Sequence, residues 1–211
     1  MNEAWLKVED FRDYCRDHPV SPLLRLILTS DGTLVGHLAS LFLKTIQVEV
    51  QAQSEIVIDD ELSRWLEIPN GETGVERKIW LTEGVPLPSS GASPAVQNNS
   101  LGGPGRKPPA RGEKKLYAVS TFPISRLKPD FYNDMKSGQK PLGQMIEERR
   151  LSTRRDQLEI GHRPFPEVAK ELGFPQDQLF WARRYRLTIS ERASGAIFEI
   201  FSPHLSSSLL F

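Results

Sequence analysis

A single acidic residue, Glu199, lies within the apolar run at positions 196–201. Alternate side chains of a strand point to opposite faces, so Ile197, Glu199 and Phe201 share one face and the intervening residues share the other. Both faces are apolar, which predicts a strand that is covered on both sides. Because a buried carboxylate without a partner is costly, Glu199 indicates a site where this charge is paired or hydrogen-bonded.

The same alternation places two arginines on apolar faces. In the segment 77–81, Arg77 shares a face with Ile79 and Leu81. In the segment 179–189, Arg183 shares a face with apolar and aromatic residues, namely Trp181, Tyr185, Leu187 and Ile189. We therefore expect two guanidinium groups and one carboxylate to point into a common interior.

Two interpretations of this polar set remain open. In the structural one, a buried arginine–glutamate pair fixes the register of neighbouring strands. In the functional one, the arginines form an anion pocket, since a guanidinium group matches a carboxylate bidentately. Glu199 would then accept a hydrogen bond from a hydroxyl or act as an acid or base. Together these groups suit a small ligand that carries a carboxylate at one end and a hydroxyl at the other.

Other residues that could do chemistry give weaker signals. The four histidines, at positions 18, 37, 162 and 204, lack the spacing of metal ligands, so we expect surface or hydrogen-bonding roles. Cys15 is the only cysteine, which excludes an internal disulfide and a multi-cysteine metal site. It lies on a predicted helix without an obvious base and is expected to be an inert thiol.

The elements that must position these residues occur in hairpin order. Strands are predicted at 46–53, 77–81, 116–122, 155–160, 179–189 and 196–201, and helices at 2–16, 34–42, 141–149 and 166–172. This order predicts an α+β fold, a single domain in which helices pack on one side of an antiparallel sheet. We expect residues 1–84 and 116–211 to form that domain.

Residues 85–115 interrupt the pattern. The segment is rich in Pro, Gly, Ser and Asn and contains no aromatic residue, which favours a disordered loop. Because consecutive strands that flank a loop usually pair, this loop is predicted to be an insertion at the tip of a hairpin. It is either a solvated linker or a docking segment.

The bulk composition narrows the classes of function. The 27 basic and 27 acidic residues balance, so no overall charge favours nucleic acid or an anionic membrane as a partner. Apolar stretches are far shorter than the ~20 residues that span a bilayer. The first residues show no targeting segment. We therefore expect a cytoplasmic protein, most simply a monomer, with a small molecule as its partner.

Beyond these patterns, the chain resembles the chorismate pyruvate-lyase family, whose members form 4-hydroxybenzoate and pyruvate from chorismate. No one of the matching pieces is specific alone, but they occur in the family's order. They are the arginine-led strand 77–81, the turn Lys140-Pro141-Leu142-Gly143, the strand pieces 152–154 and 158–161, the segment Phe180-Trp181-Ala182-Arg183-Arg184 and the closing strand Phe198-Glu199-Ile200-Phe201-Ser202-Pro203.

The resemblance implies both a fold and a site. The family fold is an antiparallel sheet with helices over one side, which encloses a buried ligand pocket. By resemblance, Arg77 binds the ring carboxylate, the backbone N–H of Leu142 contacts the same carboxylate, and Glu199 meets the 4-hydroxyl end. Leu34 falls in the segment that covers the pocket. Arg183 is a further candidate, either for the second carboxylate or for structural support.

The implied activity is a carbon–oxygen lyase for quinone biosynthesis, with either ubiquinone or plastoquinone as the end product. Aromatisation of the ring drives this reaction, so no metal or organic cofactor is expected. The alternative is a non-catalytic domain that binds a small acidic effector, because the effector-sensing domains of some transcription regulators share this fold. The chain contains no convincing helix-turn-helix segment, which disfavours a DNA-binding regulator.

Overall fold

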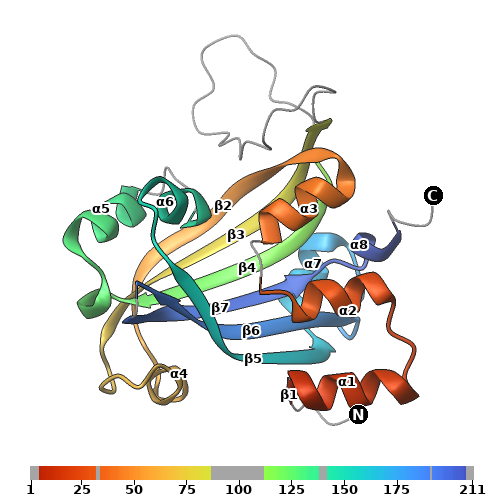
Figure 1. Ribbon diagram of the computed structural model, residues 1–211, viewed down its shortest axis with the longest axis horizontal. Coiled ribbons are helices and arrows are strands. Elements are labelled where there is room, and N and C mark those ends of the chain that lie inside the picture. The colour runs from red at the N-terminus through yellow and green to blue at the C-terminus, as the bar shows by residue number, and fades with distance from the viewer. Residues whose placement is uncertain (1–4, 32–33, 87–111, 138–141, 191, 208–211) are drawn as a thin grey trace.

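A computed structural model describes residues 5–31, 34–86, 112–137, 142–190 and 192–207. Its strands form one seven-stranded sheet in the order β1-β5-β6-β7-β4-β3-β2, and every pairing is antiparallel (Figure 1). The strands are β1 (Leu6–Lys7), β2 (Lys44–Val57), β3 (Thr73–Pro86), β4 (Lys114–Pro123), β5 (Thr153–Pro164), β6 (Leu179–Ile189) and β7 (Arg192–Phe201). The predicted α+β class with an antiparallel sheet is confirmed.

The sheet consists of two meanders that meet along one joint. Strands β2, β3 and β4 pair in sequence order, and so do β5, β6 and β7. The joint is the β4–β7 pairing, which runs from Leu116 opposite Phe201 to Thr121 opposite Ala196. The two meanders place Arg77 and Glu199 on opposite sides of this joint.

The predicted hairpin between β3 and β4 is present, with Trp80 opposite Tyr117. Both strands extend into the range predicted to be a loop, because Thr82 pairs with Lys114 and the amide of Glu83 donates to the carbonyl of Glu113 at 3.1 Å. Within the expected insertion at 85–115, Pro86 pairs with Lys44 of β2 and Lys114 pairs with Thr82, so paired residues lie at both of its ends. Residues 87–111 lie outside the described part of the chain.

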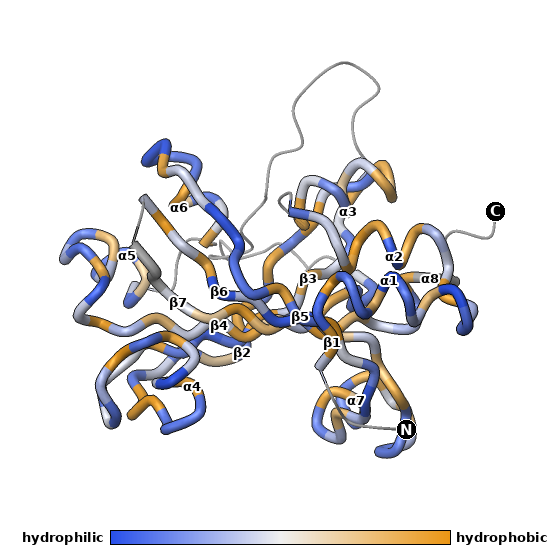
Figure 2. The backbone as a smooth tube through the Cα atoms, turned by 60° about the horizontal axis from the view of Figure 1, so that its bottom comes forward, coloured by the Kyte–Doolittle hydropathy of each residue, from blue (hydrophilic) through white to orange (hydrophobic). Residues whose placement is uncertain are grey.

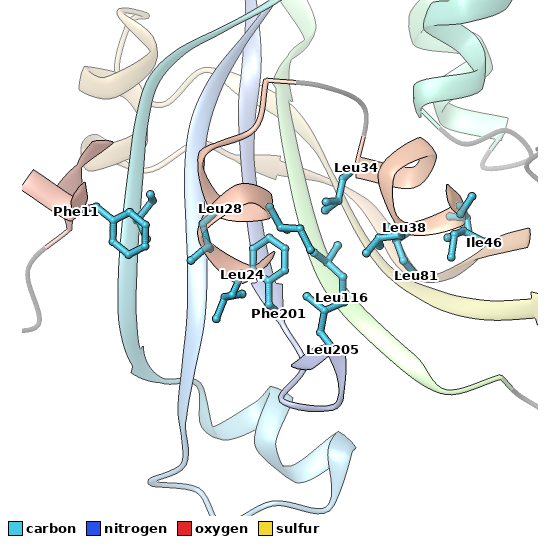
Figure 3. Close-up of a cluster of buried hydrophobic side chains, with 14 residues drawn as sticks. Phe11, Leu24, Leu28, Leu34, Leu38, Ile46, Leu81, Leu116, Phe201 and Leu205 are labelled. Carbon is cyan, nitrogen blue, oxygen red and sulfur yellow. The ribbon is translucent and has the colours of Figure 1, made fainter. Parts of the chain in front are cut away.

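One face of the sheet carries two groups of helices. The first group lies over one end of the sheet, and its apolar side chains pack on β3, β4 and β7 (Figure 3). It comprises α1 (Val8–Asp17), α2 (Pro22–Thr29) and α3 (Leu34–Phe42). The second group, α5 (Pro129–Ser137) and α6 (Leu142–Glu148), covers the other end of the same face. The helix predicted at 2–16 thus begins only at Val8, after the short strand β1.

The opposite face is also covered, which corrects the expectation that helices pack on one side only. Two helices of seven residues lie there, α4 (Asp60–Leu66) and α7 (Pro166–Leu172) (Figure 2). The reason is that this face of the sheet carries apolar side chains. Trp80, Phe180 and Ile200 point to it and are buried against Val168 and Ala169 of α7. Such side chains must be removed from water on whichever face they occur.

Local signals explain where several helices begin and end. Helix α2 starts with proline at its first position, and the Ser21 side chain accepts a hydrogen bond from the amide of Leu24. Helix α7 ends at Gly173, which adopts φ +75, a conformation that glycine reaches without strain. A last short helix, α8 (His204–Ser207), follows β7. Within the described residues, no helix has the length and apolar character that crossing a membrane requires.

Candidate functional site

Glu199 is paired within the protein. It lies on β7 directly opposite Arg183 of β6, and the Nε of Arg183 donates to its Oε2 at 2.5 Å. The hydroxyl of Tyr185 donates to its Oε1 at 3.2 Å. Only 6% of Glu199 and none of Arg183 is exposed. The buried arginine–glutamate pair that the structural interpretation predicts is therefore present in the molecule.

Arg183 also connects this pair to the helices above it. Its Nη1 donates to the carbonyl of Ile27 at 2.7 Å and to that of Ser30 at 3.0 Å, where α2 ends. Carbonyl groups at a helix C-terminus carry partial negative charge, so a cation is favourable there. Among the described residues, its Nη2 has no hydrogen-bond partner. Burial opposes the charged form, but the nearby Glu199 outweighs it and raises the pKa of Arg183.

Tyr185 and Arg155 complete what we call the Glu199 cluster, which consists of Arg155, Arg183, Tyr185 and Glu199. The guanidinium carbon of Arg155 lies 5.1 Å from the centre of the Tyr185 ring, and that of Arg183 lies 5.5 Å from it. Arg155 donates to the carbonyl of Asp31, so it also holds the end of the α2 segment. Burial, followed by the charge of Glu199, raises the pKa of Tyr185, which therefore remains a hydrogen-bond donor.

Arg77 lies on the same face but in the other meander. It is 3% exposed and pairs in register with Ser120 of β4, which pairs with Ile197 of β7. Two strand spacings, about 10 Å, separate its strand from that of Glu199. Burial lowers the pKa of Arg77, so its charged form would gain from a bound anion.

The residues between Arg77 and Glu199 are small. On β4, Ala118 lies opposite Ile79 and Glu199, while Ser120 lies opposite Arg77 and Ile197. Both are partly exposed, although they occupy a central strand of the sheet. Small side chains at these positions lower the surface of the sheet between the guanidinium and the carboxylate.

The two leucines of the predicted site flank this strip. Leu142 is the first residue of α6, is half-buried, and packs against a core cluster that includes Val75, Phe122 and Tyr185. Leu34 is the first residue of α3 and is 5% exposed. Figure 3 shows it above the strands beside Leu38. The segments just before them, residues 32–33 and 138–141, lie outside the described residues, so the roles of both leucines stay predictions.

Sequence reasoning missed Arg155, Ser120 and the contact of Tyr185 with Glu199. Tyr185 carried a usable signal, because it shares the apolar face of Arg183. Ser120 carried a weaker one, since a small polar residue follows the apolar start of a predicted buried strand. Arg155 gave none, because its partners come from the distant segments around Asp31 and Tyr185.

Among the hollows of the described surface, two are lined by residues other than Arg77 and Glu199. One, of about 640 Å³, lies at the turn 69–73 beside Ile124 and Ser125. The other, of about 330 Å³, lies between the α1–α2 connection and the ends of β6 and β7, next to Trp181. The expected enclosed pocket over Arg77 therefore stays a prediction. No set of three or more His, Cys, Asp or Glu residues in the described ranges is placed to hold a metal ion.

Comparison with known proteins gives a family match over part of the chain. Residues 109–209 match the family model described as chorismate pyruvate-lyase Rv2949c-like. This range contains Leu142, Arg183, Tyr185 and Glu199, whereas Leu34 and Arg77 precede it. No curated protein sequence gives a significant match.

Solved structures with a similar fold include effector and ligand-binding domains. PhnF from Mycobacterium smegmatis is 13% identical with a TM-score of 0.59, and the match covers 83% of this chain and 66% of that chain. The effector domain of the same protein is 12% identical with a TM-score of 0.54, covering 80% and 88%.

The ligand-binding domain of a proposed GntR-family transcriptional regulator from Bordetella bronchiseptica is 14% identical with a TM-score of 0.51, covering 75% of this chain and 86% of that one. At such identities the likeness concerns the fold. The chain thus has the fold of these effector domains, and from residue 109 to 209 it matches the model of a chorismate pyruvate-lyase family.

Proposed function

We propose that this protein binds chorismate across β4 and converts it to 4-hydroxybenzoate and pyruvate. The observation that carries the proposal is the strip of small residues, Ala118 and Ser120, between a buried arginine and a buried glutamate on one face of the sheet. The family match over residues 109–209 supports the same reaction class. The quinone pathway that would use the product is not indicated by these residues.

Each end of the ligand has a partner of suitable chemistry. The guanidinium of Arg77 would hold the ring carboxylate, and the backbone N–H of Leu142 would add a second donor. Glu199 would accept a hydrogen bond from the 4-hydroxyl. Arg183 already donates to Glu199 and to two carbonyls of the α2 segment, which favours structural support over a direct role with the second carboxylate.

In the reaction, the bond between ring carbon 3 and the ether oxygen breaks, and the enolpyruvyl group leaves. The hydrogen on carbon 4 departs as a proton, the ring becomes aromatic, and the enolpyruvate takes up a proton to give pyruvate. Glu199 would hold the 4-hydroxyl beside the carbon that loses this proton. Most of the rate would come from fixed orientation and from charges placed before the reaction begins.

The direct test is to incubate the purified protein with chorismate and to measure 4-hydroxybenzoate and pyruvate in equal amounts. Arg77→Gln should lower the affinity for 4-hydroxybenzoate about 10- to 100-fold, because a charge-assisted hydrogen bond is lost. Lys78→Gln is the matched control: Lys78 is the next residue, lies on the opposite face and pairs with Glu76. A folded protein that releases no product, or an Arg77→Gln variant that binds normally, would contradict the proposal.

A second candidate function is effector binding without turnover, and one observation favours it. Both oxygens of Glu199 already accept hydrogen bonds from the protein, which leaves less capacity for moving a proton. The fold shared with effector domains is compatible with this candidate. Calorimetric binding of 4-hydroxybenzoate, together with intact chorismate after long incubation, would identify the protein as a binding domain.

A further inference from the structure

The hydroxyl of Tyr185 occupies the position beside Glu199 that a ligand hydroxyl would need. Its hydroxyl donates to Glu199 Oε1 at 3.2 Å, while Arg183 occupies Oε2. Glu199 is 6% exposed, so little water competes for its remaining acceptor sites. The protein therefore supplies its own phenol to the carboxylate that is expected to meet the 4-hydroxyl end of the ligand.

The phenol is held firmly in this position. Tyr185 is 4% exposed and packs in the apolar cluster with Leu187 and Ile197. The guanidinium groups of Arg155 and Arg183 both approach its ring, at 5.1 Å and 5.5 Å. Because burial and Glu199 raise its pKa, the hydroxyl stays protonated across the range in which the protein would be assayed.

We propose that Tyr185 is a specificity-determining residue, which sets how strongly the site prefers ligands with a hydroxyl at the Glu199 end. By satisfying Glu199 Oε1, its phenol reduces what a ligand hydroxyl can gain there. The inference rests on the proposed function, in that it requires the ligand hydroxyl to approach Glu199.

The consequence of removing the phenol has a definite sign. In Tyr185→Phe, the ring stays beside the two guanidinium groups, but the hydroxyl that Arg155 contacts is lost and Oε1 of a buried carboxylate loses its donor. Leaving a buried acceptor unsatisfied costs about 1–3 kcal/mol, and more for a charged group. A ligand hydroxyl that reaches Oε1 recovers this cost, whereas a ligand without a hydroxyl cannot.

The experiment compares 4-hydroxybenzoate with benzoate, which differ only in the hydroxyl. Kd values for both are measured by calorimetry on the wild-type protein and on Tyr185→Phe. The ratio of the benzoate Kd to the 4-hydroxybenzoate Kd should rise about 10-fold in Tyr185→Phe, which is roughly 1.4 kcal/mol. Tyr132→Phe is the matched control, since it removes a phenol that donates at 2.6 Å to the exposed Glu55, and its ratio should equal that of the wild type.

The outcomes separate this inference from the function on which it rests. If the wild type binds 4-hydroxybenzoate but the ratio in Tyr185→Phe stays constant or falls, the specificity role is overturned and the proposed function stands. If the wild type binds neither ligand, both are overturned.

A ligand-free measurement checks the contact itself. The unfolding free energies of Tyr185→Phe, Glu199→Gln and the double variant should be non-additive if the phenol and the carboxylate interact in solution. Simple additivity would remove the basis of the inference.

Discussion

Two fully buried cations, Lys115 and Arg183, are held in different ways. The Nζ of Lys115 lies 2.9 Å from Glu83 and 2.8 Å from Glu113, and Glu83 also contacts Lys44. We call Lys44, Glu83, Glu113 and Lys115 the hairpin-base cluster, because they gather where β3 and β4 enter the insertion. In this cluster two lysines meet two carboxylates.

The Glu199 cluster has a different composition. It holds one carboxylate and two guanidinium groups, of which only Arg183 pairs with Glu199, while backbone carbonyls and the Tyr185 ring provide the other contacts of Arg183 and Arg155. Arg183 Nη2 has no hydrogen-bond partner among the described residues. The difference teaches that burial of a charge does not by itself distinguish a structural clamp from a site. What differs is the number of carboxylates: Lys115 meets two, besides the carbonyl of His204 and the Phe42 ring, whereas Arg183 meets one.

The largest expected effect comes from breaking the Glu199 cluster. Arg183→Met should lower the free energy of unfolding by about 3–5 kcal/mol, because it leaves Glu199 buried without its cation and removes a donor from two carbonyls. Urea denaturation followed by circular dichroism measures this. Arg184→Met is the control: its side chain is 27% exposed and faces the other side of the sheet, and its loss should cost about 1 kcal/mol or less.

Breaking the hairpin-base cluster should have a smaller effect. Lys115→Met removes a buried cation, but Glu83 keeps Lys44 and Glu113 is 44% exposed to water. We expect a loss of about 1–3 kcal/mol and an unchanged affinity for 4-hydroxybenzoate. If Lys115→Met proved more costly than Arg183→Met, or if it weakened ligand binding, the contrast between the two clusters would not hold.

The smallest expected effect is a dependence on pH. Burial alone would raise the pKa of Glu83, but hydrogen bonds from Lys44 and Lys115 outweigh it and hold the pKa below the usual 4.5. A carboxyl group whose pKa is lowered by folding stabilises the protein above its unfolded pKa, and this stability is lost as the pH falls below it. The difference in unfolding free energy between the wild type and Glu83→Gln should therefore be constant from pH 7 to about 5 and shrink below pH 4.5. A difference that did not change down to pH 3 would contradict this expectation.

Strand alternation predicted much of the site because it depends only on neighbouring residues. It placed Arg77, Arg183 and Glu199 on one face, and the observed register confirms this, with Arg183 directly opposite Glu199. Helix α2 was not predicted, although its last carbonyls bind Arg183 from 153 to 156 residues away in sequence. Contacts over such distances leave no local pattern. For the same reason, alternation indicated that Glu199 needs a partner but could not tell which residue takes each of its oxygens.

The division of the sheet into two meanders has a consequence for how the protein folds. Within each meander the paired strands are neighbours along the chain, whereas Leu116 and Phe201 at the joint are far apart in sequence. Pairings between distant segments carry the larger entropic cost and usually form late. Arg77 belongs to one meander and the Glu199 cluster to the other, so neither half can bind the proposed ligand alone. Binding of that ligand would therefore indicate that the β4–β7 pairing, the slowest part of folding, has formed.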